Sequence, residues 1–123
     1  MKKKRILLVD DSNTVLMMER MLLQGMGFEI FVARDGSEAL TAARQHTPDV
    51  VLMDVVMPKM NGLDACRALK ADQTTQGIPI ILVTTRGEPY NVEAGWEAGC
   101  SEYITKPFDA TEFLSKLKNV MQA

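Results

Sequence analysis

A run of four apolar residues at positions 50–53 leads directly into the single carboxylate of Asp54. An unbroken apolar run of this length is typical of a strand that is buried on both faces of a sheet. Pro58 and then Asn61-Gly62 follow, so the chain turns soon after the acid and cannot continue as a central strand. The stretch predicts a buried strand that ends at Asp54. The other strand ends decide whether this carboxylate is an ordinary loop residue or a reactive group.

Apolar runs of the same kind recur along the chain, and helical patterns separate them. Strands are predicted at residues 6–9, 29–33, 50–54, 80–83 and 102–105. Helices are predicted from Asn13 to a stop at Gly25 or Gly27, between Asp35 and Thr47, and at 63–70, 92–98 and 109–121. This alternation indicates an α/β fold, in which helices cover both faces of a parallel sheet and each crossover is right-handed.

The length, composition and charge of the chain indicate a single globular domain and argue against a nucleic-acid-binding or membrane protein. A chain of 123 residues with 46% hydrophobic and 24% charged residues is expected to form one globular domain over residues 1–123, with no output domain. The net charge of -2 argues against nucleic acid as a partner, and the basic run at residues 2–5 is expected to be a solvated lead-in. No segment suits a signal sequence or a membrane span, so a cytoplasmic location is expected.

Cysteine, histidine and methionine residues form no site pattern in this sequence. Cys66 and Cys100 lie on separate elements without the spacing of a metal site, so both are expected to be reduced, partly buried thiols. His46 is expected at the surface, at the end of the second helix. The nine methionines are expected mostly at core positions, where they need no cofactor.

Chemically useful side chains follow four of the predicted strands. Because parallel strands end at one edge of a sheet, Asp10, Asp11, Asp54, Thr84 and Lys106 are expected to lie close together. Two carboxylates about 4 Å apart near a protein surface repel by roughly 4 kcal/mol, so the site needs positive charge. Lys106 supplies one charge, and Mg²⁺ suits the all-oxygen ligands.

Such a site is suited to a phosphoryl group. Asp54 would attack phosphorus as an ionised carboxylate, while the cation, Lys106 and the Thr84 hydroxyl balance the charge on the phosphoryl oxygens. Each residue also has an ordinary structural interpretation: Asp10-Asp11 as a helix-capping turn, Thr84 as a strand-to-loop transition, and Lys106 as a solvated side chain. Because all five side chains are expected at one edge of the sheet, a shared reactive site is favoured over these separate structural roles.

Four motifs together resemble the receiver domain of two-component response regulators, of the stand-alone type found in chemotaxis regulators. The motifs are Leu8-Val9-Asp10-Asp11, Asp54-Val55-Val56-Met57-Pro58 followed by Asn61-Gly62, Thr84, and Tyr103-Ile104-Thr105-Lys106-Pro107. The resemblance covers nearly the whole chain. It implies a three-layer, doubly wound (βα)5 flavodoxin-like sandwich whose parallel sheet has the strand order 2-1-3-4-5.

The resemblance also implies roles for the residues at the sheet edge. Asp54 would accept a phosphoryl group from a phosphohistidine on a sensor histidine kinase or a phosphotransfer protein. Asp11, Asp54 and the backbone carbonyl of Val56 would hold Mg²⁺, and Asp10 would act largely through water. Lys106 would contact the phosphoryl oxygens.

A conformational switch is implied in the same way. Thr84 would close on the phosphoryl oxygens, and Tyr103 would turn inward to fill the space that Thr84 leaves. The Lys106–Pro107 bond is expected to be cis, because this bond is usually cis in the family and X–Pro bonds tolerate that isomer.

A partner face is expected on the fourth helix, the fifth strand and the fifth helix. A helical register that buries Ala94 and Ala98 turns Val92 and Trp96 outward, beside Tyr103. Trp96 is therefore expected to contact a protein partner whose binding depends on phosphorylation.

Three positions bear on how long a phosphoryl group persists. Thr85 is usually smaller in the family, which predicts tighter access to the phosphoryl group. Val56 cannot hydrogen-bond an attacking water, whereas Arg86 can pair with the phosphoryl group. The expected loss of phosphate takes minutes or longer.

The residues leave other functions open. The chain could relay phosphate to a further histidine, act as a phosphate sink, or be the receiver part of a longer regulator. A flavodoxin-like phosphohydrolase would use the same acids, but the short loops offer no substrate pocket, so no enzyme activity is expected beyond self-phosphorylation and slow dephosphorylation. A flavin binder is disfavoured because no phosphate-cradling loop follows the first strand. A monomer or a weak phosphorylation-dependent dimer is expected.

Overall fold

The computed structural model describes residues 3–85 and 92–121, in which five strands alternate with five helices. The strands are β1 (Arg5–Val9), β2 (Glu29–Ala33), β3 (Val50–Asp54), β4 (Ile80–Thr85) and β5 (Glu102–Lys106). The helices are α1 (Asn13–Leu23), α2 (Gly36–His46), α3 (Gly62–Ala71), α4 (Val92–Ala98) and α5 (Ala110–Met121). The predicted alternation of elements is confirmed.

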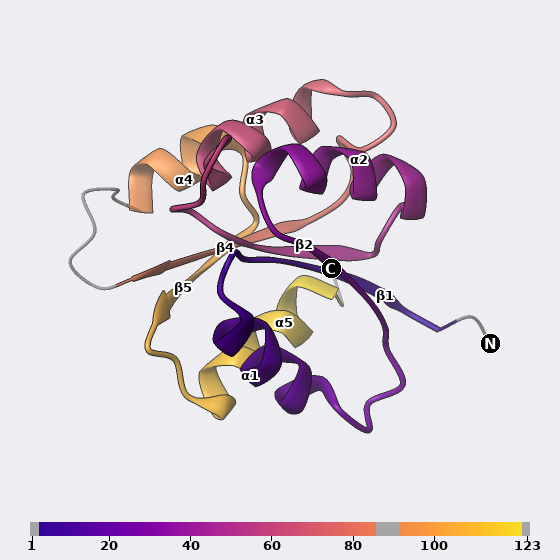
Figure 1. Cartoon of the computed structure of the whole chain (residues 1–123), viewed down its shortest axis with the longest axis vertical. Helices are drawn as coiled ribbons and strands as arrows, with labels where there is room; N and C mark the ends of the chain where they lie inside the picture. Colours follow the sequence, from indigo (N-terminus) through magenta and orange to yellow (C-terminus); the bar gives the residue numbers. More distant parts are fainter. Residues whose placement is uncertain (1–2, 86–91, 122–123) are drawn as a thin grey trace.

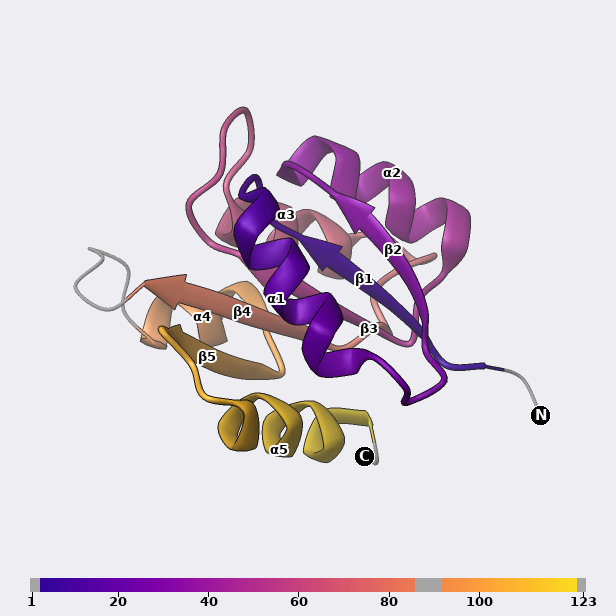
Figure 2. The same ribbon diagram turned by 60° about the horizontal axis from the view of Figure 1, so that its bottom comes forward.

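The strands form one parallel sheet in the order β2-β1-β3-β4-β5. Helices α2, α3 and α4 cover one face, whereas α1 and α5 cover the other (Figures 1 and 2). This arrangement confirms the three-layer sandwich and the strand order that the family resemblance implied. Of the helices in the described residues, none has the length and apolar character needed to cross a membrane.

The core is divided between the two faces of the sheet because successive side chains of a strand point to opposite sides. The cluster under α2, α3 and α4 includes Leu7, Val51, Met53 and Leu82. The cluster under α1 and α5 includes Ile6, Leu8, Leu52, Ile81 and Phe113. All five residues of β3 are buried, as expected for a central strand covered on both faces.

Two strands run further than the apolar pattern predicts. β4 continues to Thr85 and β5 to Lys106, because the two strands pair with Thr84 opposite Thr105 and Thr85 opposite Lys106. Polar residues can extend a strand when their backbone groups bond to a neighbour. This extension carries Thr84 and Lys106 to the edge of the sheet.

The prediction that the methionines mostly occupy core positions is wrong for α1 and the segment after it. Met17, Met18 and Met21 are 59%, 48% and 65% exposed, and Met26, which follows the helix, is 50% exposed. The inward face of α1 is instead formed by Leu16, Glu19 and Leu23. Adjacent apolar residues on a helix point in different directions, so a run rich in methionine fits more than one register.

His46 also differs from its expected position at the surface. Its ring is half-buried and stacks on Phe31, with ring centroids 3.8 Å apart. The two cysteines, Cys66 and Cys100, are buried and unpaired, as predicted. Burial raises the pKa of each thiol to about 11, so both stay protonated at neutral pH.

Candidate functional site

The ends of four strands meet at one edge of the sheet. Asp10 and Asp11 directly follow β1, Asp54 is the last residue of β3, and Lys106 is the last residue of β5. Asp54 is level with Val83 of β4, so Thr84 lies one step further along the neighbouring strand. The parallel sheet thus delivers all five predicted side chains to the same edge.

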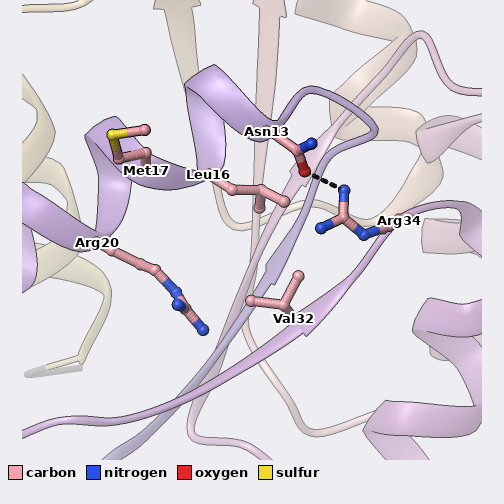
Figure 3. Close-up of a pocket in the computed structure, with 6 residues that line it drawn as sticks. All are labelled: Asn13, Leu16, Met17, Arg20, Val32 and Arg34. Carbon is pink, nitrogen blue, oxygen red and sulfur yellow. Dashed lines mark hydrogen bonds between the residues drawn. The ribbon is translucent and has the colours of Figure 1, made fainter.

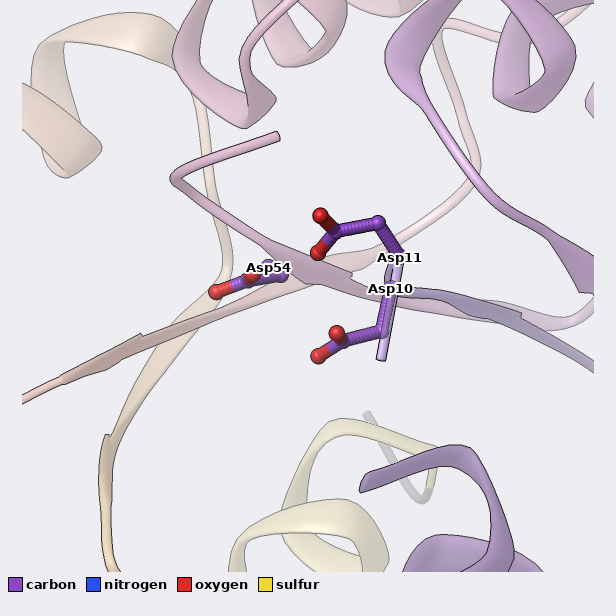
Figure 4. A group of neighbouring side chains, drawn as sticks. All are labelled: Asp10, Asp11 and Asp54. Atoms are coloured by element: carbon purple, nitrogen blue, oxygen red, sulfur yellow. The ribbon is translucent and has the colours of Figure 1, made fainter. Parts of the chain in front are cut away.

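The three aspartates form a compact acidic group (Figure 4). One carboxylate oxygen from each of Asp10, Asp11 and Asp54 lies within 4.8 Å of the other two. Asp10 and Asp54 are buried, whereas Asp11 is exposed. Asp10 is held in place by the backbone N–H of Ser12, which donates to its Oδ1 at 2.9 Å, and Ser12 in turn caps α1.

Lys106 provides positive charge opposite the acids. Its Nζ lies 3.3 Å from Oδ2 of Asp10 and 3.4 Å from Oδ1 of Asp54, and its side chain is 17% exposed. The peptide bond from Lys106 to Pro107 is cis, as predicted. The expected pairing of a lysine with the acidic group is confirmed.

Burial and neighbouring charge shift the pKa values in this site. Burial, followed by repulsion from Asp10, raises the pKa of Asp54 to about 6, although the nearby ammonium of Lys106 opposes the rise. Burial on its own would lower the pKa of Lys106, but attraction to Asp54 and Asp10 outweighs it and raises that pKa. Asp54 is therefore mostly ionised at neutral pH, and Lys106 is fully charged.

The acidic group has the donor atoms that a magnesium ion requires. Oδ1 of Asp54 is buried and accepts no hydrogen bond within the described residues, although the Lys106 ammonium is near. Val56 follows β3 in the loop, and no hydrogen bond to its carbonyl oxygen forms within residues 3–85 and 92–121. Carboxylate and carbonyl oxygens are the ligands that Mg²⁺ takes in proteins, so the residues present fit this ion.

Thr84 and Tyr103 are both buried, with exposed fractions of 4% and 8%. The ring of Tyr103 lies against Gly95 of α4, where an added Cβ would fall 2.9 Å from Cε2 of the ring. Trp96 is 47% exposed, which confirms that it faces outward. Tyr103 therefore occupies the inward position in this structure.

Several predicted residues are not placed by the structure. Arg86 lies outside the described residues, and the side chains of Thr85 and Val92 do as well. Val56 is described and is 46% exposed.

Sequence reasoning did not single out Glu19, which belongs to the surroundings of the site. This glutamate of α1 is only 2% exposed, and its Oε1 has no hydrogen-bond partner in the described part of the chain. Burial, with repulsion from Asp10, raises its pKa to about 8. Its spacing from Leu16 and Leu23 is the signal that could have placed it on the buried face.

The comparison with known families agrees with this geometry. The profile described as "Response regulator receiver domain" matches residues 6–118. The chain belongs to the response regulator receiver domain family. Receiver domains are the phosphorylation-activated signalling modules of two-component systems.

Two curated relatives differ in how much of their length the receiver domain occupies. The DNA-binding response regulator MtrA of Mycolicibacterium smegmatis is 41% identical over 94% of this chain, which spans only 50% of that protein. The protein PilH of Pseudomonas aeruginosa is 40% identical, over 95% of this chain and 97% of PilH. The chain thus corresponds to about half of some relatives and to nearly all of another.

A solved receiver domain has the same fold. The receiver domain of the sensor histidine kinase PA1611 from Pseudomonas aeruginosa has a TM-score of 0.90 and 27% identity, over 99% of this chain and 100% of that domain. That domain contains a magnesium ion coordinated in its active site cleft. Receiver domains bind Mg²⁺ in an acidic site and interact with histidine kinases or phosphotransfer proteins.

Proposed function

We propose that Asp54 is the phosphoacceptor of this receiver domain. The observation that supports this role best is its position, at the end of β3, among two further aspartates and 3.4 Å from the Lys106 ammonium. An oxygen of the ionised carboxylate attacks phosphorus of a phosphohistidine, the N–P bond breaks, and the imidazole leaves and takes up a proton. Asp54 then carries an acyl phosphate.

The residues around Asp54 stabilise charge during this transfer. Asp11, Asp54 and the carbonyl of Val56 would hold Mg²⁺, and Asp10 would act through water. When bound, Mg²⁺ neutralises part of the charge on the phosphoryl oxygens. The Lys106 ammonium pairs with another phosphoryl oxygen, and the Thr84 hydroxyl donates a hydrogen bond to the phosphoryl group.

Phosphorylation changes the partner face made by α4, β5 and α5. Thr84 moves toward the phosphoryl group, and the inward position of Tyr103 is the one compatible with this movement. A shift between two such arrangements changes partner affinity only if the partner binds one of them better. The exposed indole of Trp96 supplies part of this face, so Trp96→Ala weakens phosphorylation-dependent binding and leaves phosphorylation intact.

The partners follow from this role. A histidine kinase or a phosphotransfer protein supplies the phosphoryl group, and a protein target responds to it. The chain acts as a receiver domain over residues 1–123, either alone, as a relay intermediate or as part of a longer regulator, and its pathway, including any role in chemotaxis or motility, stays a prediction. It has no further enzymatic substrate, and small phosphoesters are not turned over.

Phosphorylation by a small donor tests the assignment of Asp54. The wild type, Asp54→Asn and Asp64→Asn are incubated with acetyl phosphate and Mg²⁺, and intact masses are recorded. Asp64 is an exposed aspartate at the start of α3, so Asp64→Asn is a matched control. The wild type and the control gain one phosphoryl group, whereas Asp54→Asn gains none. An equal mass gain in Asp54→Asn would assign the phosphoacceptor elsewhere.

A further inference from the structure

A cavity lies between α1 and β2, on the opposite side of β1 from Asp54. Its volume is about 260 Å³, and the residues that line it are Asn13, Leu16, Met17, Arg20, Val32 and Arg34. Figure 3 shows the side chains of Arg20 and Arg34 on either side of Val32. None of the three aspartates lines the cavity, which is therefore distinct from the acidic site, although the two adjoin where the Asp10 N–H donates to the carbonyl of Ala33.

The two arginines of this cavity differ from the other arginines that the structure describes. Those outside the cavity each pair with a carboxylate: Arg5 with Glu29 at 3.1 Å, Arg44 with Asp72 at 2.7 Å and Arg67 with Asp64 at 2.9 Å. Within residues 3–85 and 92–121, Arg20 and Arg34 have no such partner. The cavity is therefore lined by the two arginines that form no ion pair with a described carboxylate.

The contacts of Arg34 position its guanidinium without neutralising it. Its Nη1 donates to the neutral amide oxygen of Asn13, the first residue of α1. The carboxylate of Glu38 is close, but its Oε1 accepts from the backbone N–H of Arg34, at 3.1 Å. The side chain is thus oriented toward α1 and keeps its charge available.

Two like charges around a small cavity favour an anion between them. Guanidinium groups bind phosphate and carboxylate through paired N–H donors, and a dianion balances two of them. The cavity also has apolar walls, because Leu16 is buried, Val32 is half-buried and the Met17 side chain is 59% exposed. An anionic group with an apolar substituent matches both kinds of surface.

We propose that this cavity binds a small phosphomonoester dianion that carries an apolar group. The anionic group lies between Arg20 and Arg34, and the apolar group packs on Leu16, Met17 and Val32. The volume is just below the usual range for ligand pockets, about 300–1,000 Å³, which limits the ligand to roughly one ring and one anionic group. This site is independent of phosphorylation at Asp54.

Phenylphosphonate is a suitable probe because its P–C bond cannot transfer a phosphoryl group. It is titrated into the ¹⁵N-labelled protein in Mg²⁺-free buffer with a chelator, and amide shifts are followed by NMR. Saturable shifts are expected around Asn13, Arg20 and Arg34, and unchanged binding is expected in Asp54→Asn. Benzoate, with one negative charge, and inorganic phosphate, without a ring, are expected to bind more weakly.

Substitutions test whether the two arginines hold the anion. Arg20→Gln and Arg34→Gln are each expected to weaken binding about tenfold or more, as the loss of a charge-assisted hydrogen bond predicts. Arg20→Lys keeps the charge but loses the paired donors, so its affinity for phenylphosphonate is expected to lie between those of the wild type and Arg20→Gln. Arg44→Gln removes an exposed arginine on α2 and is expected to bind like the wild type.

Three outcomes would overturn this proposal. They are no saturable binding of phenylphosphonate, shifts that map to another surface, and equal affinity in the Arg20→Gln and Arg34→Gln variants. Both arginines are exposed, so the variants are expected to fold, and thermal melts recorded by circular dichroism check this.

Discussion

The ammonium nitrogen of Lys106 lies 3.4 Å from Oδ1 of Asp54, although β4 separates the strands that end at these residues. The long lysine side chain reaches across the end of the intervening strand and brings its charge among the carboxylates. The pair therefore links the last strand of the sheet to the central one at the proposed phosphoacceptor.

Lys106→Met is expected to destabilise the protein by about 1–3 kcal/mol at pH 7.5, because it leaves buried carboxylates without compensating charge. The loss is expected to shrink at pH 5, where Asp54, with its pKa near 6, is already largely protonated. Urea unfolding at the two pH values measures both effects. Lys118→Met, on the exposed side of α5, is the control, and equal losses at both pH values in Lys106→Met would contradict the assigned role of its charge.

Glu19→Gln is expected to make stability less dependent on pH. The folded pKa of Glu19 is about 8 and its ordinary value is 4.5, so in between these values the folded protein keeps a proton that the unfolded chain releases. The contribution of Glu19 is therefore fully present below pH 4.5 and is lost as pH rises toward 8. The free energy of unfolding of Glu19→Gln minus that of the wild type is expected to increase by on the order of 2–4 kcal/mol from pH 5 to pH 8. Asp54 is present in both proteins, so its titration largely cancels in this difference, and a constant difference across the range would show that Glu19 is ionised when folded.

Gly95→Ala is expected to destabilise the protein by about 1–2 kcal/mol, although alanine favours helix more than glycine does. The new Cβ would fall 2.9 Å from the ring of Tyr103 and 3.2 Å from Cδ1 of Leu82. In a Tyr103→Ala background the main clash is absent, so the same change is expected to be neutral or stabilising. A double-mutant cycle by urea unfolding measures the coupling, with Gly77→Ala as a control because a Cβ there meets nothing within 4 Å. Additive effects would mean that Tyr103 does not pack on Gly95.

The phosphorylated protein is expected to lose phosphate with a half-life of minutes or longer. Val56 lies in the loop two residues after the end of β3, is 46% exposed, and has a side chain that offers no hydrogen bond to an attacking water. Val56→Asn introduces an amide that can orient this water, and is expected to shorten the half-life by on the order of tenfold, the effect of one hydrogen bond. Val56→Ile keeps the apolar character and serves as the control. Half-lives are followed by intact mass after removal of the donor, and a wild-type value of a few seconds would contradict this prediction.

Much of the fold could be predicted because the strands are continuous apolar runs. The run that ends at Asp54 has no helical period and no polar break, so it specifies a buried strand and the place where it ends. The edge that collects Asp10, Asp54 and Lys106 then follows from parallel pairing alone. The order of the strands was taken from the family resemblance, because periodicity does not say which strands are neighbours.

The features that the sequence analysis missed depend on which face of a helix packs inward and on contacts between elements. Glu19 is buried because Leu16 and Leu23 fix the register of α1, whereas its own charge would suggest exposure. The methionines of α1 show the reverse case, because they are apolar and yet exposed. The helix has more apolar residues than its inward face can bury, so some of them face solvent. The half-buried ring of His46 depends on Phe31, which belongs to a different element. The contact between His46 and Phe31 joins residues of two different elements, so no local pattern encodes it.

The loop after β3 leaves no room for a side chain at residue 62. A Cβ on Gly62 would fall 2.2 Å from the carbonyl oxygen of Asp54, and the Gly62 N–H donates to the carbonyl of Val55 at 2.7 Å. Any alanine or larger residue would push this loop off the backbone that supports the carboxylate. The absence of a side chain at residue 62 therefore lets α3 begin directly against the backbone that carries the proposed phosphoacceptor.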